Sequence, residues 1–128
     1  GKPGLASRHV LAVDNDPDAL EALRQVLVGW GCSVAIAADG ASADAALRER
    51  DADLWLFDYH LDAGDTGVAL AGRLRAVHGQ RPCLILSADQ TDAVRRAVRD
   101  ADLPLLAKPV RPLALKSVLD RLLAARAM

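Results

Sequence analysis

The chain has 128 residues, a length that fits one domain and leaves no room for a second. Hydrophobic residues make up 52% of it and charged residues 26%, a composition that supports an aliphatic core and excludes disorder. The chain has sixteen basic and seventeen acidic residues, and its arginines are scattered along the sequence, so we expect no direct contact with nucleic acid. No apolar stretch approaches the roughly 18 residues that span a bilayer, and we expect a cytoplasmic domain without direct membrane contact.

In chain order, short apolar runs alternate with segments of helical spacing. Residues 1–8 contain Gly, Pro, Ser and Lys without periodicity, and we interpret them as a linker or cloning remnant before a domain at 9–126. Five apolar runs, each bounded by polar, Gly or Pro residues, indicate buried parallel strands at 10–13, 34–37, 54–57, 84–86 and 105–107. Both cysteines, Cys32 and Cys83, lie in apolar surroundings, so we expect buried free thiols.

The segments between these runs predict helices. Leu20, Leu23 and Leu27 repeat at helical spacing, and so do later apolar sets in the chain. Residues 41–50 are rich in alanine with Leu47 as their one large apolar residue, so helical propensity carries that prediction. Strict alternation of strands and helices predicts an α/β fold with a parallel sheet and right-handed crossovers.

Polar residues collect directly after four of the apolar runs. In chain order they are Asp14-Asn15-Asp16, Asp58, Ser87 and Lys108-Pro109. Ligands of open parallel sheets bind outside the carboxyl ends of the strands, so we expect these side chains to meet at one edge. Asp14 and Asp58 carry most weight, because an uncompensated carboxylate beside a buried run costs several kcal/mol.

Each of these residues also has an ordinary structural interpretation. Asp16 fits an N-cap before Pro17, Ser87 a strand-end hydroxyl that satisfies the backbone, and Lys108 a solvated charge. As a set they match phosphoryl transfer to a carboxylate, in which a divalent cation screens the nucleophile and Lys and Ser donors hold the phosphoryl oxygens. Oxygen ligands with one open position suit Mg²⁺ or Mn²⁺.

Four motifs at successive strand ends resemble those of response-regulator receiver domains. They are Leu11-Ala12-Val13-Asp14-Asn15-Asp16-Pro17, Leu56-Phe57-Asp58, Leu86-Ser87-Ala88 and Lys108-Pro109. The resemblance spans residues 9 to 124. It implies a flavodoxin-like, doubly wound (βα)5 fold with strand order 2-1-3-4-5, and a cis peptide bond at Lys108-Pro109.

The same resemblance implies a role for each site residue. Asp58 would accept a phosphoryl group from phosphohistidine, with Lys108 as a phosphoryl ligand and Ser87 as the hydroxyl that senses it. Ligands for Mg²⁺ are implied at four positions: Asp14, Asn15, Asp58 and the backbone carbonyl of His60. A histidine kinase or a histidine phosphotransfer domain is the implied partner, and the oligomeric state is open.

Three positions depart from the usual receiver pattern. Asn15 stands where receivers commonly have a second acid, which predicts a weaker metal site. Leu61-Asp62 replaces the usual Met-Pro and Gly67 comes one residue late, so this loop should differ in shape. Leu105 stands where many receivers carry Tyr or Phe, so we expect no output relay through an aromatic ring.

Two further segments, Gly29-Trp30-Gly31-Cys32 and Asp58-Tyr59-His60-Leu61-Asp62, resemble receivers at the C-terminal end of hybrid sensor histidine kinases. Such a parent would carry its kinase catalysis outside this chain and could be tethered to a membrane. His9 and His78 are interpreted as solvated surface residues.

Two alternative functions remain open from the sequence. A pseudo-receiver that binds partners without being phosphorylated is favoured by Asn15 and the altered loop. A haloacid-dehalogenase-like phosphatase would use Asp14 as its nucleophile, but it leaves Asp58 without a role. Modification of Asp58, of Asp14 or of neither by a small phosphodonor separates the three.

Overall fold

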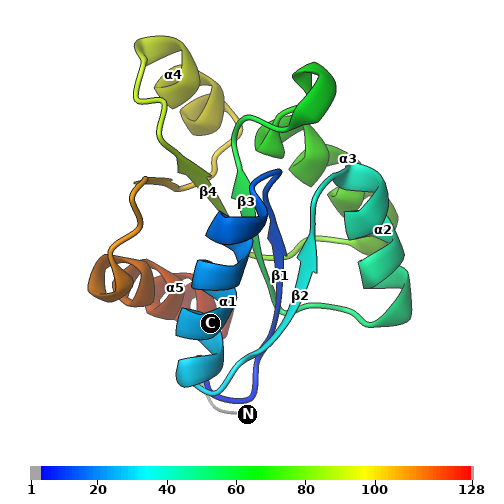
Figure 1. The fold of residues 1–128 in the computed structure, drawn as a ribbon, viewed down its shortest axis with the longest axis vertical. Coiled ribbons are helices and arrows are strands. Elements are labelled where there is room, and N and C mark those ends of the chain that lie inside the picture. Colours follow the sequence, from blue (N-terminus) through cyan, green and yellow to red (C-terminus); the bar gives the residue numbers. More distant parts are fainter. Residues whose placement is uncertain (1–3, 128) are drawn as a thin grey trace.

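The computed structural model describes residues 4–127, and its sheet has the predicted topology (Figure 1). The strands are β1 (His9–Val13), β2 (Ser33–Ala37), β3 (Leu54–Asp58), β4 (Cys83–Ser87) and β5 (Leu105–Ala107). All neighbours pair in parallel, in the order β2-β1-β3-β4-β5. Apart from Asp58 at the end of β3, the residues of β1, β3 and β4 are buried, as expected for apolar runs covered on both faces.

Helices cover both faces of the sheet. They are α1 (Pro17–Gly29), α2 (Gly40–Glu49), α3 (Gly67–His78), α4 (Asp92–Asp100) and α5 (Pro112–Ala127), with a short 3-10 turn η1 (Asp62–Gly64) before α3. The alanine-rich helix forms one residue earlier than predicted, because Asp39 accepts a hydrogen bond from Ser42 N and caps it. Asp16 caps α1, as its ordinary interpretation predicts.

The core has two layers because successive side chains of a strand point to opposite faces. Trp55 and Phe57 stack with ring centroids 5.5 Å apart on the side covered by α2, α3 and α4. Leu54 and Leu56 point to the other side, where α1 and α5 pack. Cys32 and Cys83 are buried free thiols, as predicted.

The segment interpreted as a linker is attached to the domain from residue 5 onward. Leu5 is 4% exposed and packs in the α1 and α5 layer. Ser7 N donates to Gly31 O at 2.9 Å, and Cys32 Sγ donates to Leu5 O at 3.3 Å. The first residues described therefore cover one end of the core.

The interpretation of two histidines as solvated surface residues is wrong. His9 is 8% exposed, and its Nδ1 lies 2.7 Å from Ser33 Oγ on the neighbouring strand. The side chain of His78 is 13% exposed, and its Nε2 lies 2.7 Å from Asp44 Oδ1 of α2. Both partners come from elements far away in the sequence, so sequence spacing gave no sign of either pair.

Among residues 4–127, no helix combines the length and apolar character needed to cross a bilayer.

Candidate functional site

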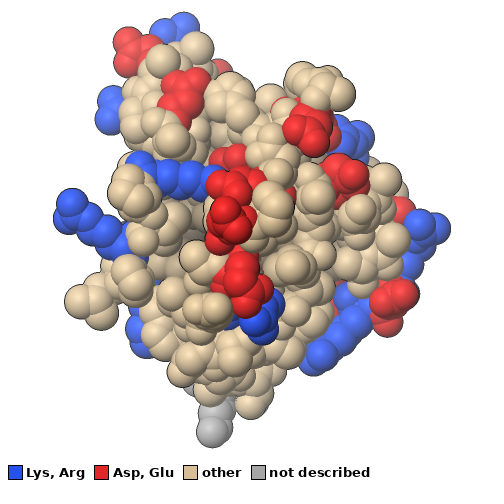
Figure 2. All heavy atoms as spheres, in the orientation of Figure 1, with Lys and Arg blue, Asp and Glu red and all other residues tan. Residues whose placement is uncertain are grey.

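The sheet register brings the predicted strand-end residues together at its carboxyl edge. Val13, which precedes Asp14, pairs with Phe57, which precedes Asp58. Asp58 in turn pairs with Leu86, and Ser87 pairs with Ala107, one residue before Lys108. Figure 2 shows acidic side chains gathered in the upper middle of this face, where the strands end in Figure 1.

An ammonium group bridges the two predicted carboxylates. Lys108 Nζ lies 2.5 Å from Asp14 Oδ2 and 3.2 Å from Asp58 Oδ1. The other Asp14 oxygen accepts a hydrogen bond from Asp16 N at 2.9 Å. The side chains of Asp14 and Asp58 are 7% and 13% exposed, so both charges are compensated within the protein more than by water. The Lys108-Pro109 bond that precedes α5 is cis, as predicted.

Burial and neighbouring charges set the protonation of this group. Burial raises the pKa of Asp58 above its ordinary value, and the charge of Asp14 adds to the rise, while Lys108 opposes it. For Lys108, burial alone would lower the pKa, but the two carboxylates outweigh it and raise the pKa. The site therefore combines a desolvated carboxylate with an ammonium that stays protonated.

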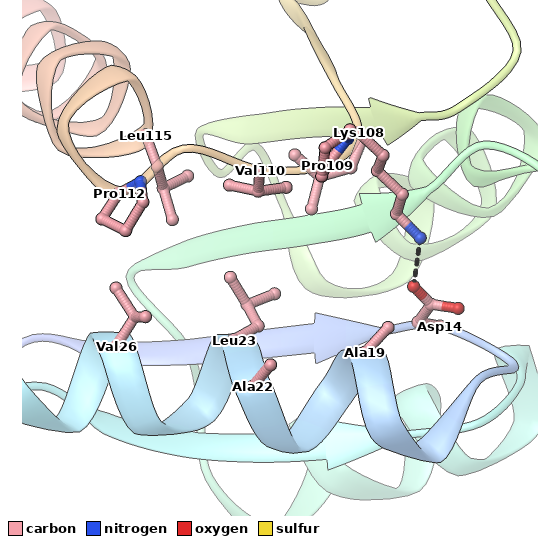
Figure 3. Close-up of a pocket in the computed structure, with 11 residues that line it drawn as sticks. Asp14, Ala19, Ala22, Leu23, Val26, Lys108, Pro109, Val110, Pro112 and Leu115 are labelled. Atoms are coloured by element: carbon pink, nitrogen blue, oxygen red, sulfur yellow. Dashed lines mark hydrogen bonds and ion pairs between the residues drawn. The ribbon is translucent and has the colours of Figure 1, made fainter.

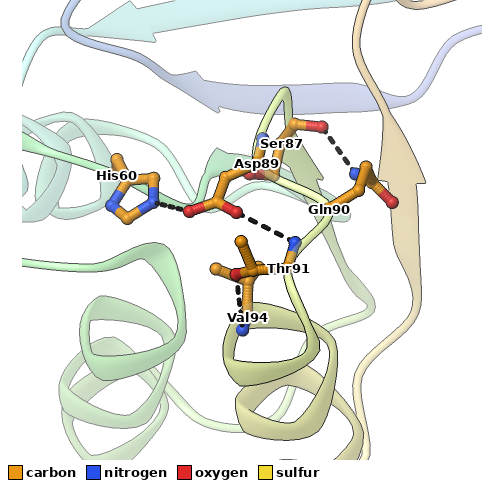
Figure 4. Close-up of polar contacts among 6 residues, drawn as sticks. All are labelled: His60, Ser87, Asp89, Gln90, Thr91 and Val94. Carbon is orange, nitrogen blue, oxygen red and sulfur yellow. Dashed lines mark hydrogen bonds and ion pairs between the residues drawn. The ribbon is translucent and has the colours of Figure 1, made fainter.

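Ser87 is held by the loop that follows β4 (Figure 4). Its hydroxyl is buried and accepts a hydrogen bond from Asp89 N at 3.0 Å. The Asp89 carboxylate accepts from His60 Nε2 at 2.8 Å and from Thr91 N at 3.0 Å. The His60 contact, followed by the bonds to Thr91, lowers the pKa of Asp89 to about 2. The pair of His60 and Asp89 thus joins the loops after β3 and β4 across the mouth of the site.

Sequence reasoning assigned no role to Asp89, although it stands two residues after Ser87. The signal available was its position, because it lies in a loop at the same edge of the sheet. The same reach of two residues that includes Asp16 after the first strand and His60 after Asp58 includes Asp89 after Ser87.

The loop between β3 and α3 is closed by an antiparallel bridge between His60 and Thr66. Gly67 N donates to Tyr59 O at 2.8 Å and Leu61 N donates to Asp65 O at 3.0 Å. These bonds flank His60 and leave its carbonyl oxygen outside the bridge. A Cβ on Gly67 would lie 2.4 Å from Asp58 O, so the chain passes too close to Asp58 there for any side chain.

The predicted metal ligand Asn15 contacts this loop. It is exposed, and its Nδ2 donates to Asp62 Oδ1 at 2.9 Å. Asp62 follows Asp58 by four residues and has no predicted role of its own. The structure therefore adds Asp62 to the rim of the site.

Comparison with known proteins agrees with this geometry. A model of the response regulator receiver domain matches residues 10–120. The chain belongs to this family. The transcriptional regulatory protein ZraR of Salmonella typhimurium is 33% identical over 116 residues, which cover 90% of this chain and 26% of ZraR. The DNA-binding response regulator MtrA of Mycolicibacterium smegmatis is 37% identical over 107 residues, which cover 82% of this chain and 46% of MtrA.

Solved receiver structures share the fold. A CheY-like response regulator receiver domain protein from Methanospirillum hungatei superposes with a TM-score of 0.85 at 22% identity, covering 95% of this chain and 98% of that one. A putative response regulator from Chloroflexus aurantiacus gives 0.83 at 30% identity, covering 92% and 98%. The chain thus matches solved receivers over nearly their whole length, whereas it spans about a quarter of ZraR.

The donor set of this receiver domain fits Mg²⁺. Within residues 4–127, no group of three or more His, Cys, Asp or Glu side chains gathers for a metal. Mg²⁺ needs fewer, because it keeps several waters and is usually held by one or two carboxylates. Asp14 and Asp58 supply two, and the Asn15 amide and the His60 carbonyl add neutral oxygens of the kind that this ion prefers.

An apolar cleft of about 290 Å³ opens beside the site (Figure 3). Leu23 and Val26 of α1 line one wall, and Val110 and Leu115 line the other. Asp14 and Lys108 lie at one end of the cleft. A partner that reaches the two carboxylates from this side would therefore meet an apolar surface first.

Proposed function

We propose that this receiver domain accepts a phosphoryl group from phosphohistidine onto Asp58, as one step of a two-component phosphorelay. The observation that supports the proposal most is the Lys108 ammonium, which lies within 3.2 Å of a carboxylate oxygen on both Asp14 and Asp58. A structural ion pair requires one carboxylate. A second one, half-buried and with a raised pKa, is expected where a carboxylate must act as a nucleophile.

The proposed transfer uses these contacts. An Asp58 carboxylate oxygen forms a bond to phosphorus while the bond between phosphorus and the donor imidazole nitrogen breaks. That nitrogen keeps the electron pair, and the ring, protonated on its other nitrogen, leaves as neutral imidazole. Lys108 holds a phosphoryl oxygen, and the Ser87 hydroxyl can donate its O–H to another while its oxygen accepts from Asp89 N. Bound Mg²⁺ would screen the carboxylates from the incoming oxygens, with Asp14, Asn15, Asp58 and the His60 carbonyl as its ligands.

The donor histidine belongs to a histidine kinase or a histidine phosphotransfer domain in this proposal. The cleft between α1 and the segment after β5 gives such a donor an apolar surface beside the carboxylates. A cytoplasmic location and a hybrid-kinase parent stay predictions. ZraR and MtrA are named as transcriptional or DNA-binding regulators, and this chain spans 26% of the first and 46% of the second.

Intact mass after incubation with acetyl phosphate and Mg²⁺ tests the proposal. The wild-type chain should gain one phosphoryl group, and Asp58→Asn should gain none. Asp18→Asn, which changes an exposed aspartate on α1, is the matched control and should be labelled like the wild type. Labelling of Asp14 would support the phosphatase alternative, and no labelling of a folded wild-type chain would support the pseudo-receiver.

A further inference from the structure

Two departures from the usual receiver pattern contact each other. Asn15 replaces a common acid in the loop after β1, and Asp62 lies in the loop after β3. Asn15 Nδ2 donates to Asp62 Oδ1 at 2.9 Å, although the two residues are 47 positions apart in the sequence. An amide therefore stands where a carboxylate is usual, and a carboxylate stands next to that amide.

The chemistry of this pair fixes the orientation of the amide. A carboxylate can only accept hydrogen bonds, so the NH₂ group of Asn15 must face Asp62. The carbonyl Oδ1 then occupies the other arm of the planar amide. In the flipped orientation, NH₂ would occupy that arm, and a cation there would meet two N–H donors in place of an oxygen ligand.

The backbone holds Asp62 in place for this contact. Leu61 is buried, and its N–H bonds to Asp65 O, while Asp65 N donates to Asp62 O at 3.2 Å. The guanidinium group of Arg73 in α3 donates two hydrogen bonds to the Asp65 carboxylate, at 3.0 and 2.7 Å. Because the turn is anchored on both sides, Asp62 is presented to Asn15 in spite of its exposure to solvent.

We infer that Asp62 is a positioning residue of the Mg²⁺ site, which orients the Asn15 amide with its oxygen toward the metal and supplies the negative charge that Asn15 lacks. The inference rests on the proposed function, since Mg²⁺ is part of it. In the usual pattern one acidic residue supplies both an oxygen ligand and a negative charge. Here Asn15 supplies the oxygen, and Asp62, which accepts a hydrogen bond from Asn15, supplies the charge.

Calorimetric titration of the chain with Mg²⁺ measures the effect. Asp62→Asn should weaken Mg²⁺ affinity by about tenfold, the lower end of the range for residues that orient metal ligands. The matched control is Asp18→Asn, which removes the same charge from an exposed position in the first turn of α1. Its effect should be smaller, and it should fade when the salt concentration is raised, as expected for a screened long-range charge.

Testing Asp62→Asn in the Asn15→Asp variant distinguishes a positioning role of Asp62 from an effect on folding. In Asn15→Asp, residue 15 carries its own charge and has no amide to orient, so adding Asp62→Asn should strengthen Mg²⁺ binding or leave it unchanged. Equal weakening by Asp62→Asn in both backgrounds, or equal weakening by Asp18→Asn and Asp62→Asn, would overturn the inference. Amide spectra without metal establish that each variant is folded.

The outcomes also separate this inference from the proposed function. If the wild type binds Mg²⁺ and is labelled on Asp58 while Asp62→Asn binds as tightly, the inference alone fails. If the folded wild-type chain does not bind Mg²⁺, both the inference and the metal part of the proposed function fail.

Discussion

Lys108 does not compensate the two carboxylates equally. Its ammonium is 2.5 Å from Asp14 and 3.2 Å from Asp58. Asp14 also accepts a hydrogen bond from Asp16 N, whereas burial and the Asp14 charge together keep the pKa of Asp58 raised. The charge on Asp58 is thus the less compensated of the two, and it has more to gain from a bond to phosphorus.

Replacing Asp58 should stabilise the fold. Because its pKa is raised, Asp58 favours the folded state at low pH, and this contribution is lost as pH rises through the raised pKa. At pH 7 the ionised group is therefore unfavourable, and Asp58→Asn should raise the free energy of unfolding by about 1 kcal/mol. Urea unfolding at pH 7 and pH 4 measures this, and the gain should shrink at pH 4.

The control for this prediction is Asp14→Asn. It removes the closer partner of Lys108 and should lower the free energy of unfolding by about 2 kcal/mol at pH 7. If Asp58→Asn were no more stable than the wild type at pH 7, Lys108 would have to compensate the Asp58 charge fully.

At the scale of elements, strands position the reactive groups and loops adjust them. Strand ends were predictable within one residue, because apolar runs between polar residues mark buried parallel strands, and Asp14, Asp58, Ser87 and Lys108 follow from that pattern. Contacts between loops were not predictable. The pair of Asn15 and Asp62 depends on the turn geometry of η1, where Ala63 has a φ of 57°, and a single sequence does not specify such geometry.

The start of α3 offers a test of how tightly this loop is fitted. Gly67→Ala places a Cβ against Asp58 O, so the backbone must shift, and we expect a loss of about 2 kcal/mol in unfolding free energy together with slower labelling of Asp58. Gly72→Ala lies in the same helix with nothing within 4 Å of the new Cβ, and it should add about 1 kcal/mol. Urea unfolding and timed mass measurements compare the two variants. Equal stability of the two would show that the approach at Gly67 is not tight.

Across the whole molecule, the two edges of the sheet have different chemistry. Asp14 directly follows β1 at the carboxyl edge, whereas His9 begins the same strand at the opposite edge. His9 is buried, its ring contacts Ser33, and its backbone N–H donates to Asp53 Oδ2 at 2.8 Å. Burial lowers the pKa of His9, Arg50 lowers it further, and Asp53, Asp51 and the Ser33 contact oppose this. A titration at this edge should therefore affect folding and not phosphoryl chemistry.

The pH dependence of stability tests this separation. Because the pKa of His9 is lowered in the fold, the unfolded chain binds a proton at this histidine more readily than the folded chain does. The contribution of His9 to the free energy of unfolding is therefore fully present above the ordinary histidine pKa of 6.5, and it is lost as the pH falls below that value. One such group contributes a slope of at most about 1.4 kcal/mol per pH unit. In urea unfolding, His9→Gln should reduce this loss of stability between pH 7 and pH 5. Labelling of Asp58 by acetyl phosphate at pH 7 should stay at the wild-type level, because the substitution lies at the far edge of the sheet.

An unchanged pH slope in the variant would show that another group carries the titration. Loss of labelling in a folded His9→Gln chain would show that the two edges are coupled through β1, and the division between a chemical edge and a structural edge would not hold.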